Sequence, residues 1–61
     1  MKWTPKHGQY YYYISADGDV VRTQNLGIWF DEAVIKIGNC FRTKKQAEVV
    51  RDKFIKLLEE E

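Results

Sequence analysis

Four consecutive tyrosines at positions 10–13 constrain the fold of this chain more than any other feature. Aromatic and β-branched side chains favour a pleated, partly buried backbone, so we expect a strand over residues 9–15. The segment 16–19, Ala-Asp-Gly-Asp, contains a glycine that tolerates positive φ and therefore predicts a tight reversal. A second strand over residues 19–24 would then pair antiparallel with the first.

Alternation along the first strand divides its side chains between two faces of the sheet. Tyr10, Tyr12 and Ile14 share one face, and Tyr11 and Tyr13 share the other. Ile14 is the most apolar of the five, so we expect its face to be the core side and Tyr11 and Tyr13 to point outward. An outward tyrosine pair is equally suited to a subunit interface and to a surface on which a ligand stacks.

The rest of the chain predicts one more strand and one helix. An apolar run at residues 33–37, closed by Gly38 and Asn39, is interpreted as a third strand. From Thr43 the apolar period changes from two to 3.6, and Thr43 with Gln46 matches a capping box. The apolar stripe that follows consists of Ala47, Val50, Phe54, Leu57 and Leu58.

The predicted fold is therefore α+β, a small antiparallel three-stranded β-meander packed against one C-terminal α-helix. We expect a single domain, with an extended lead-in at 1–8, the meander at 9–42 and the amphipathic helix at 43–60. A core built from 61 residues contributes only about 3–5 kcal/mol of stability. The one cysteine, Cys40, cannot form an internal disulfide, and with the one histidine it falls short of a structural zinc site. Homo-oligomerisation is the expected source of additional stability.

Composition argues against several classes of function. Ten Lys and Arg residues against nine Asp and Glu leave a net charge of +1, far below the excess of a generic DNA-coating protein. No apolar run approaches the roughly 18 residues of a membrane span, so we expect a cytoplasmic protein without membrane contact. Ser15 lacks a nucleophile elbow, and His7 and Cys40 have ordinary structural explanations. We expect a non-enzymatic protein with no cofactor and no metal.

Positive charge gathers where a helix should begin. Arg42, Lys44 and Lys45 surround the predicted first turn, although the partial positive charge of free amides there favours acidic residues. An anion at this position would meet free amides and cationic side chains together, which suits a phosphate. The alternative is three solvated cations without a ligand.

Exposed aromatic rings beside local positive charge are typical of nucleotide-binding surfaces. We expect aromatic side chains to stack on a base, cations to neutralise phosphate and Asn39 to form hydrogen bonds with base edges. The predicted stacking residues are Tyr11, Tyr13, Trp3 and Trp29, and the predicted phosphate-binding residues are Arg22, Arg42, Lys44 and Lys45.

Several motifs together resemble those of short proteins encoded by phages and prophages. The chain has a W-x-P-x-x-G opening from Trp3 to Gly8, the tyrosine-rich strand, and a G-N-x-F-x-T-x-x-x-A entry to the helix from Gly38 to Ala47. The resemblance implies a phage origin, a meander capped by one helix, and interference with host defence. One form of such interference is a sponge, an oligomer that sequesters nucleotide signals of host immunity in the host cytoplasm.

Our leading hypothesis is a homo-oligomer that captures a small nucleotide-derived, phosphate-bearing ligand. The first alternative is a protein-interaction module that inhibits a host protein through the same aromatic face. The second is a weak single-stranded nucleic-acid binder, against which the near-neutral charge argues.

Overall fold

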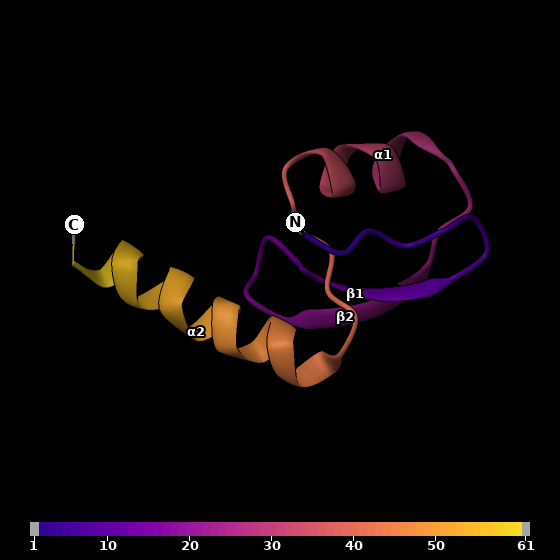
Figure 1. Ribbon diagram of the computed structural model, residues 1–61. Coiled ribbons are helices and arrows are strands. Elements are labelled where there is room, and N and C mark those ends of the chain that lie inside the picture. The colour runs from indigo at the N-terminus through magenta and orange to yellow at the C-terminus, as the bar shows by residue number, and fades with distance from the viewer. Residues whose placement is uncertain (1, 61) are drawn as a thin grey trace.

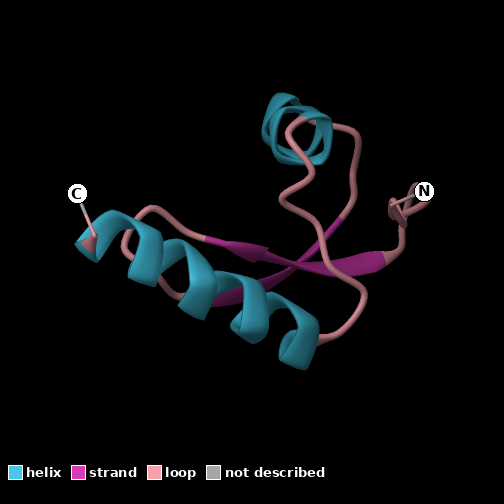
Figure 2. Ribbon diagram, turned by 60° about the vertical axis from the view of Figure 1, so that its left-hand side comes forward, coloured by secondary structure: helices cyan, strands magenta, loops and turns pink. Residues whose placement is uncertain are grey.

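Two strands and two helices make up the regular structure of residues 2–60, the part of the chain that this computed structural model describes. In chain order they are β1 (Tyr10–Ile14), β2 (Val20–Gln24), α1 (Trp29–Lys36) and α2 (Lys44–Glu59). The strands form an antiparallel sheet, with α1 over one face and α2 over the other (Figures 1 and 2). The predicted α+β class with an antiparallel sheet is confirmed, in a three-layer arrangement.

The hairpin between β1 and β2 forms where the sequence predicts it. Gly18 adopts a φ of +89°, a conformation that other residues rarely adopt. The Ser15 amide donates to the Asp19 carbonyl at 2.8 Å, and the Ser15 hydroxyl donates to the Asp17 carboxylate. The resulting register places Ile14 opposite Val20.

The third strand predicted at residues 33–37 is wrong, because residues 33–36 belong to helix α1. Asp31 stabilises the start of this helix. Its Oδ2 accepts hydrogen bonds from the backbone amides of Leu26 at 3.0 Å and Ile28 at 3.4 Å. Backbone amides at the start of a helix and in the loop before it have no acceptor within the helix. When they are partly buried, they need side-chain acceptors such as Asp31.

The end of α1 is a Schellman motif centred on Gly38, which has a φ of +82°. The Gly38 amide donates to the Ile35 carbonyl at 3.0 Å, and the Asn39 amide donates to the Val34 carbonyl at 2.8 Å. The glycine that we interpreted as the end of a strand is therefore the end of a helix. A short apolar run between polar residues fits either element, and capping decides between them.

The free edge of β1 is covered without a third strand. Tyr12 and Phe41 exchange two backbone hydrogen bonds, each 2.9 Å long, which form an isolated antiparallel bridge. Two positions along, the Asn39 side chain takes the place of a strand: its Oδ1 accepts from the Ile14 amide and its Nδ2 donates to the Ile14 carbonyl, both at 2.9 Å. Covering an edge in this way protects it from pairing with other chains.

The main core lies between the sheet and α1. Tyr11 is fully buried there with Val34 and Cys40, and Tyr13 packs edge-on against Phe30 with ring centroids 4.9 Å apart. The predicted outward orientation of Tyr11 and Tyr13 is therefore wrong. We expected one helix and hence one covered face, but α1 covers the face that the prediction left open.

Helix α2 confirms the predicted C-terminal helix. The Thr43 hydroxyl accepts a hydrogen bond from the Gln46 amide at 3.2 Å, which is one of the two bonds of the predicted capping box. Ala47 is the one α2 residue among those described that is fully buried. Beyond it the helix extends past the hairpin (Figure 1), and Phe54 and Leu57 remain 52% and 63% exposed. The predicted apolar stripe is therefore fully buried only at Ala47, whereas Phe54 and Leu58 border the edge of β1 and stay about half exposed.

Candidate functional site

The aromatic and cationic residues predicted to form one binding surface lie on opposite faces of the sheet. Tyr11, Tyr13 and Trp3 pack in the core on the α1 side. Lys44 and Lys45 begin α2, Arg42 lies just before its N-cap, and all three are exposed on the α2 side. The predicted arrangement, in which the same ligand stacks on the tyrosines and contacts the cations, is not assembled.

Tyr11 is unavailable for stacking because it is buried and hydrogen-bonded. Its hydroxyl donates to Oδ1 of Asp31 at 2.6 Å, and Asp31 is itself only 2% exposed. Burial first, and then this hydrogen bond to a carboxylate, raise the pKa of Tyr11 well above its ordinary value. Burial opposes the ionisation of Asp31, but the hydrogen bonds from Tyr11 and from backbone amides outweigh it and hold the Asp31 pKa below its ordinary value.

The two tryptophans differ in exposure. Trp3 is half-buried against the main core, and its carbonyl accepts a hydrogen bond from the Cys40 thiol at 3.7 Å. Trp29, the first residue of α1, is 78% exposed and touches Phe30 edge-on. Of the four predicted stacking residues, Trp29 is the one that presents most of its ring to solvent.

On the α2 side, a tyrosine that was predicted to lie in the core is exposed. The Arg22 guanidinium lies 4.0 Å from the ring centroid of Tyr10, which is 48% exposed. Alternation places Tyr10 and Tyr12 on the same face, and Tyr12 bridges to Phe41 just before Arg42. The aromatic ring on the same face as the basic cluster is therefore Tyr10. The alternation was correctly inferred and α2 covers the predicted face, but the Tyr11 and Tyr13 face, predicted to be open, is the more deeply buried of the two.

Asn39 has no free amide group for a base edge, since both of its polar atoms bond to the Ile14 backbone. Its role in this structure is to complete the edge of β1.

The two candidate nucleophiles, Cys40 and Ser15, are both engaged in structural contacts. Cys40 is buried, and that burial raises the pKa of its thiol, which disfavours the reactive thiolate. Ser15 is engaged in the hairpin turn with Asp17 and Asp19. Residues 2–60 contain no group of three or more potential metal ligands. Neither helix within that range combines the length and the apolar character that a membrane span requires.

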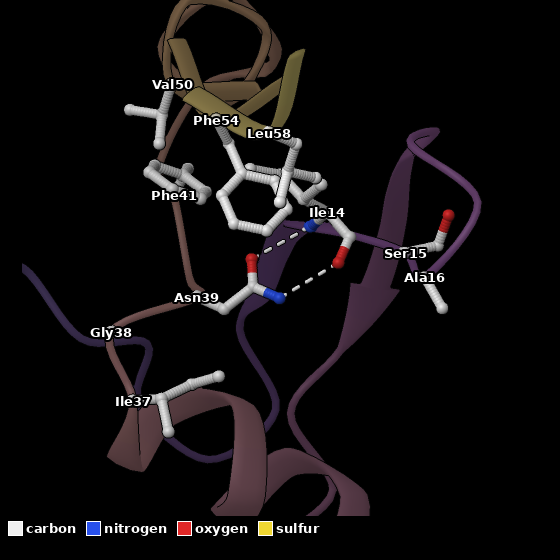
Figure 3. Close-up of a pocket in the computed structure, with 10 residues that line it drawn as sticks. All are labelled: Ile14, Ser15, Ala16, Ile37, Gly38, Asn39, Phe41, Val50, Phe54 and Leu58. Carbon is white, nitrogen blue, oxygen red and sulfur yellow. Dashed lines mark hydrogen bonds between the residues drawn. The ribbon is translucent and has the colours of Figure 1, made fainter. Parts of the chain in front are cut away.

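A groove of about 560 Å³, which we call the α2 groove, lies between α2 and the edge of β1. Figure 3 shows Phe54 and Leu58 pointing from α2 toward Ile14 and Asn39, with Phe41 beside them. The lining residues are Ile14, Ser15, Ala16, Ile37, Gly38, Asn39, Phe41, Val50, Phe54 and Leu58.

The α2 groove is chemically suited to apolar side chains. None of its lining residues is charged, so a phosphate inside it would lose hydration without gaining a cationic partner. Ile37, at one wall, is 77% exposed, and Leu57 adds an exposed apolar side chain on the neighbouring part of α2. Several exposed apolar side chains on one groove and its helix are unusual for a small soluble monomer.

The lengths of the helix and strands indicate this exposed apolar surface, but the predictions from the sequence did not compare them. A helix of 16 residues is about 24 Å long, whereas a strand of five residues spans about 17 Å. A helix that is longer than the strands it covers leaves part of its apolar stripe without a partner.

Comparisons with known proteins leave the chain without an assigned relative. No protein-family model, no curated protein and no solved structure matches it. The resemblance to short phage proteins therefore stays a prediction from the motifs alone.

Proposed function

We propose that this protein is a non-catalytic interaction module that binds a polypeptide helix in the α2 groove. The observation that carries the proposal is the exposure of Val50, Phe54, Leu57 and Leu58, at 40–63%, along a groove without charged side chains. An amphipathic helix laid into an apolar groove is a recurring mode of peptide recognition, with anchors spaced three and four residues apart. The burial of Cys40 and the engagement of Ser15 in a turn support a role without nucleophilic catalysis.

A photo-crosslinking residue at position 57 tests this proposal in the intact chain. Leu57 lies beside the groove, and Asp52 is exposed on another side of the same helix, so Leu57 and Asp52 serve as test and matched control positions. The proposal predicts covalent adducts with polypeptide from position 57 and not from position 52. Equal yields at the two positions, or no adduct from position 57, would refute it.

Inhibition of a host protein is the biological role that we attach to this module. It depends on the phage origin that the sequence motifs imply. The same cross-linked adduct, identified by mass spectrometry, tests that role separately, because it reports which polypeptide occupies the groove.

A second candidate function is the capture of a nucleotide-derived anion, which was the leading hypothesis from the sequence. The start of α2 still supports it. Lys44 and Lys45 are exposed in a first turn that has no acidic residue, and they lie on the same face of the sheet as the Tyr10 and Arg22 pair. Calorimetry against cyclic dinucleotides, ADP-ribose derivatives and short oligonucleotides tests it. Binding that is lost in Lys44→Glu/Lys45→Glu and in Tyr10→Ala supports it, and the absence of binding refutes it.

The same calorimetry distinguishes nucleotide capture from the third hypothesis, a weak single-stranded nucleic-acid binder. A single-stranded nucleic-acid binder would show an affinity that rises with oligonucleotide length and falls steeply with salt.

A further inference from the structure

We propose that the occupant of the α2 groove is α2 of a second copy of this chain, packed antiparallel about a two-fold axis. The inference rests on the proposed function and names its partner. Three independent features of the described residues support it: surface area, the spacing of the apolar stripe, and the distribution of charge along α2.

The surface area is larger than a compact chain of this mass should have. A folded monomer of 7.3 kDa is expected to expose roughly 4,200 Å², whereas this chain exposes 4823 Å². The excess, roughly 600 Å², approaches the roughly 800 Å² that each partner buries in a standard protein interface. The later turns of α2 extend past the hairpin (Figure 1), and Phe54, Leu57 and Leu58 in those turns are 52–63% exposed.

The apolar stripe has the spacing of a helix-pairing seam. The exposed residues Val50, Phe54 and Leu57 follow one another at intervals of four and three, which is the a/d pattern of paired helices, and Ala47, three residues earlier, continues the spacing but is buried in its own chain. Two heptads are short for an isolated coiled coil. The α2 groove supplies additional apolar contact, because Ile37 and Phe41 line its other wall.

Charge along α2 selects the antiparallel orientation. The helix begins with Lys44 and Lys45 and ends with Glu59 and Glu60, each pair at the end where the helix dipole of its own chain disfavours it. An antiparallel partner reverses this situation. It brings its negative C-terminal end, with its glutamates, beside the lysines, whereas a parallel partner would place like charges together.

One register aligns the apolar seam and also brings the oppositely charged helix ends to the same level. In an antiparallel two-fold pair, the residue numbers of any two residues at the same level add up to the same value along the whole seam. When Val50 faces Phe54 of the partner subunit, the end of α2 that carries Lys44 and Lys45 lies at the same level as the glutamate-bearing end of the partner's α2. Exposed charge pairs add little affinity, so their effect is to specify orientation, while the apolar seam provides most of the binding.

Sedimentation equilibrium of the purified full chain, at concentrations up to about 1 mM, tests the proposal. We expect a monomer–dimer equilibrium that Leu57→Glu weakens about 100-fold or more, because each dimer loses two buried leucines. The matched control is Val49→Glu. Val49 is also exposed and apolar on α2, but it lies off the seam, so this variant should still dimerise.

Orientation is tested by reversing charge at the helix ends. Lys44→Glu/Lys45→Glu and Glu59→Lys/Glu60→Lys should each weaken the dimer, and combining all four changes in one chain should restore it. A parallel dimer would not show this rescue. Circular dichroism of each variant establishes that it is folded at the concentration used.

The outcomes separate a failure of the dimer from a failure of the proposed function. If wild type stays monomeric while position 57 cross-links to another protein, the groove binds a polypeptide but not a second copy, and the dimer inference is refuted. If wild type dimerises and Leu57→Glu has no effect, the dimer uses a different surface and the inference is again refuted. If the dimer forms through α2 as described, position 57 yields adducts of twice the chain mass.

Discussion

Removing the Tyr11 hydroxyl should destabilise this protein far more than removing the Tyr13 hydroxyl. The Tyr11 hydroxyl donates to Oδ1 of Asp31 at 2.6 Å, and both groups are almost completely buried. Oδ2 of Asp31 keeps its backbone amide partners, so Oδ1 is the atom that loses its hydrogen bond. In Tyr11→Phe a buried carboxylate oxygen is left without a donor.

A hydrogen bond to a charged group contributes about 1.5–3 kcal/mol, and this sets the expected loss in Tyr11→Phe. A core of this size supplies only about 3–5 kcal/mol in total, so the loss is about half of the stability. At 4–8 °C per kcal/mol, the midpoint of thermal unfolding should fall by at least about 6 °C. Tyr13→Phe removes a hydroxyl that makes no hydrogen bond within residues 2–60, and it should change stability by less than about 0.5 kcal/mol.

Urea unfolding, followed by circular dichroism at one fixed protein concentration, provides the measurement. The coupling between the two groups is then obtained from a double-mutant cycle with Asp31→Asn. If Tyr11→Phe and Tyr13→Phe lose the same stability, or if the cycle gives no coupling, the buried pair does not make the contribution that we assign to it.

Three other contacts lead to further predictions. The folded pKa of Asp31 lies below its ordinary value of 3.8, so the contribution of its carboxylate to stability is complete above pH 3.8 and is lost as pH falls through the folded pKa. The difference in stability between wild type and Asp31→Asn should therefore shrink below about pH 4. A difference that does not change with pH would contradict this. Gly38→Ala should cost about 1–2 kcal/mol in urea unfolding, because φ is +82° there, and an unchanged midpoint would argue against the Schellman end of α1. Asn39→Asp keeps the acceptor for the Ile14 amide but places a carboxylate oxygen against the Ile14 carbonyl, so it should destabilise the chain by about 1–3 kcal/mol, whereas a neutral effect would show that the edge of β1 does not depend on this amide.

Local chemistry allowed part of the fold to be predicted from the sequence. The hairpin depends on a glycine with positive φ between two strand-forming segments, and the start of α2 depends on a threonine cap three residues before Gln46. Both signals act over a few residues, so no knowledge of the rest of the chain is required. The strand at positions 10–14 and the alternation of its tyrosines were inferred on the same basis.

Contacts between distant residues decided what these segments do. Alternation indicates which tyrosines share a face, but which face is more deeply buried depends on α1, whose Asp31 contacts Tyr11 from 20 positions away. The role of Asn39 likewise depends on its meeting Ile14, 25 positions earlier in the chain. The candidate site depends on similar long-range packing, because the overhang of α2 and the walls of its groove exist only once α2 and the edge of β1 lie side by side. The sequence by itself therefore determined the hairpin, helix α2 and the charge at each end of α2. The tertiary structure decided that residues 33–36 are helical, which apolar side chains fill the core and which remain exposed for a partner.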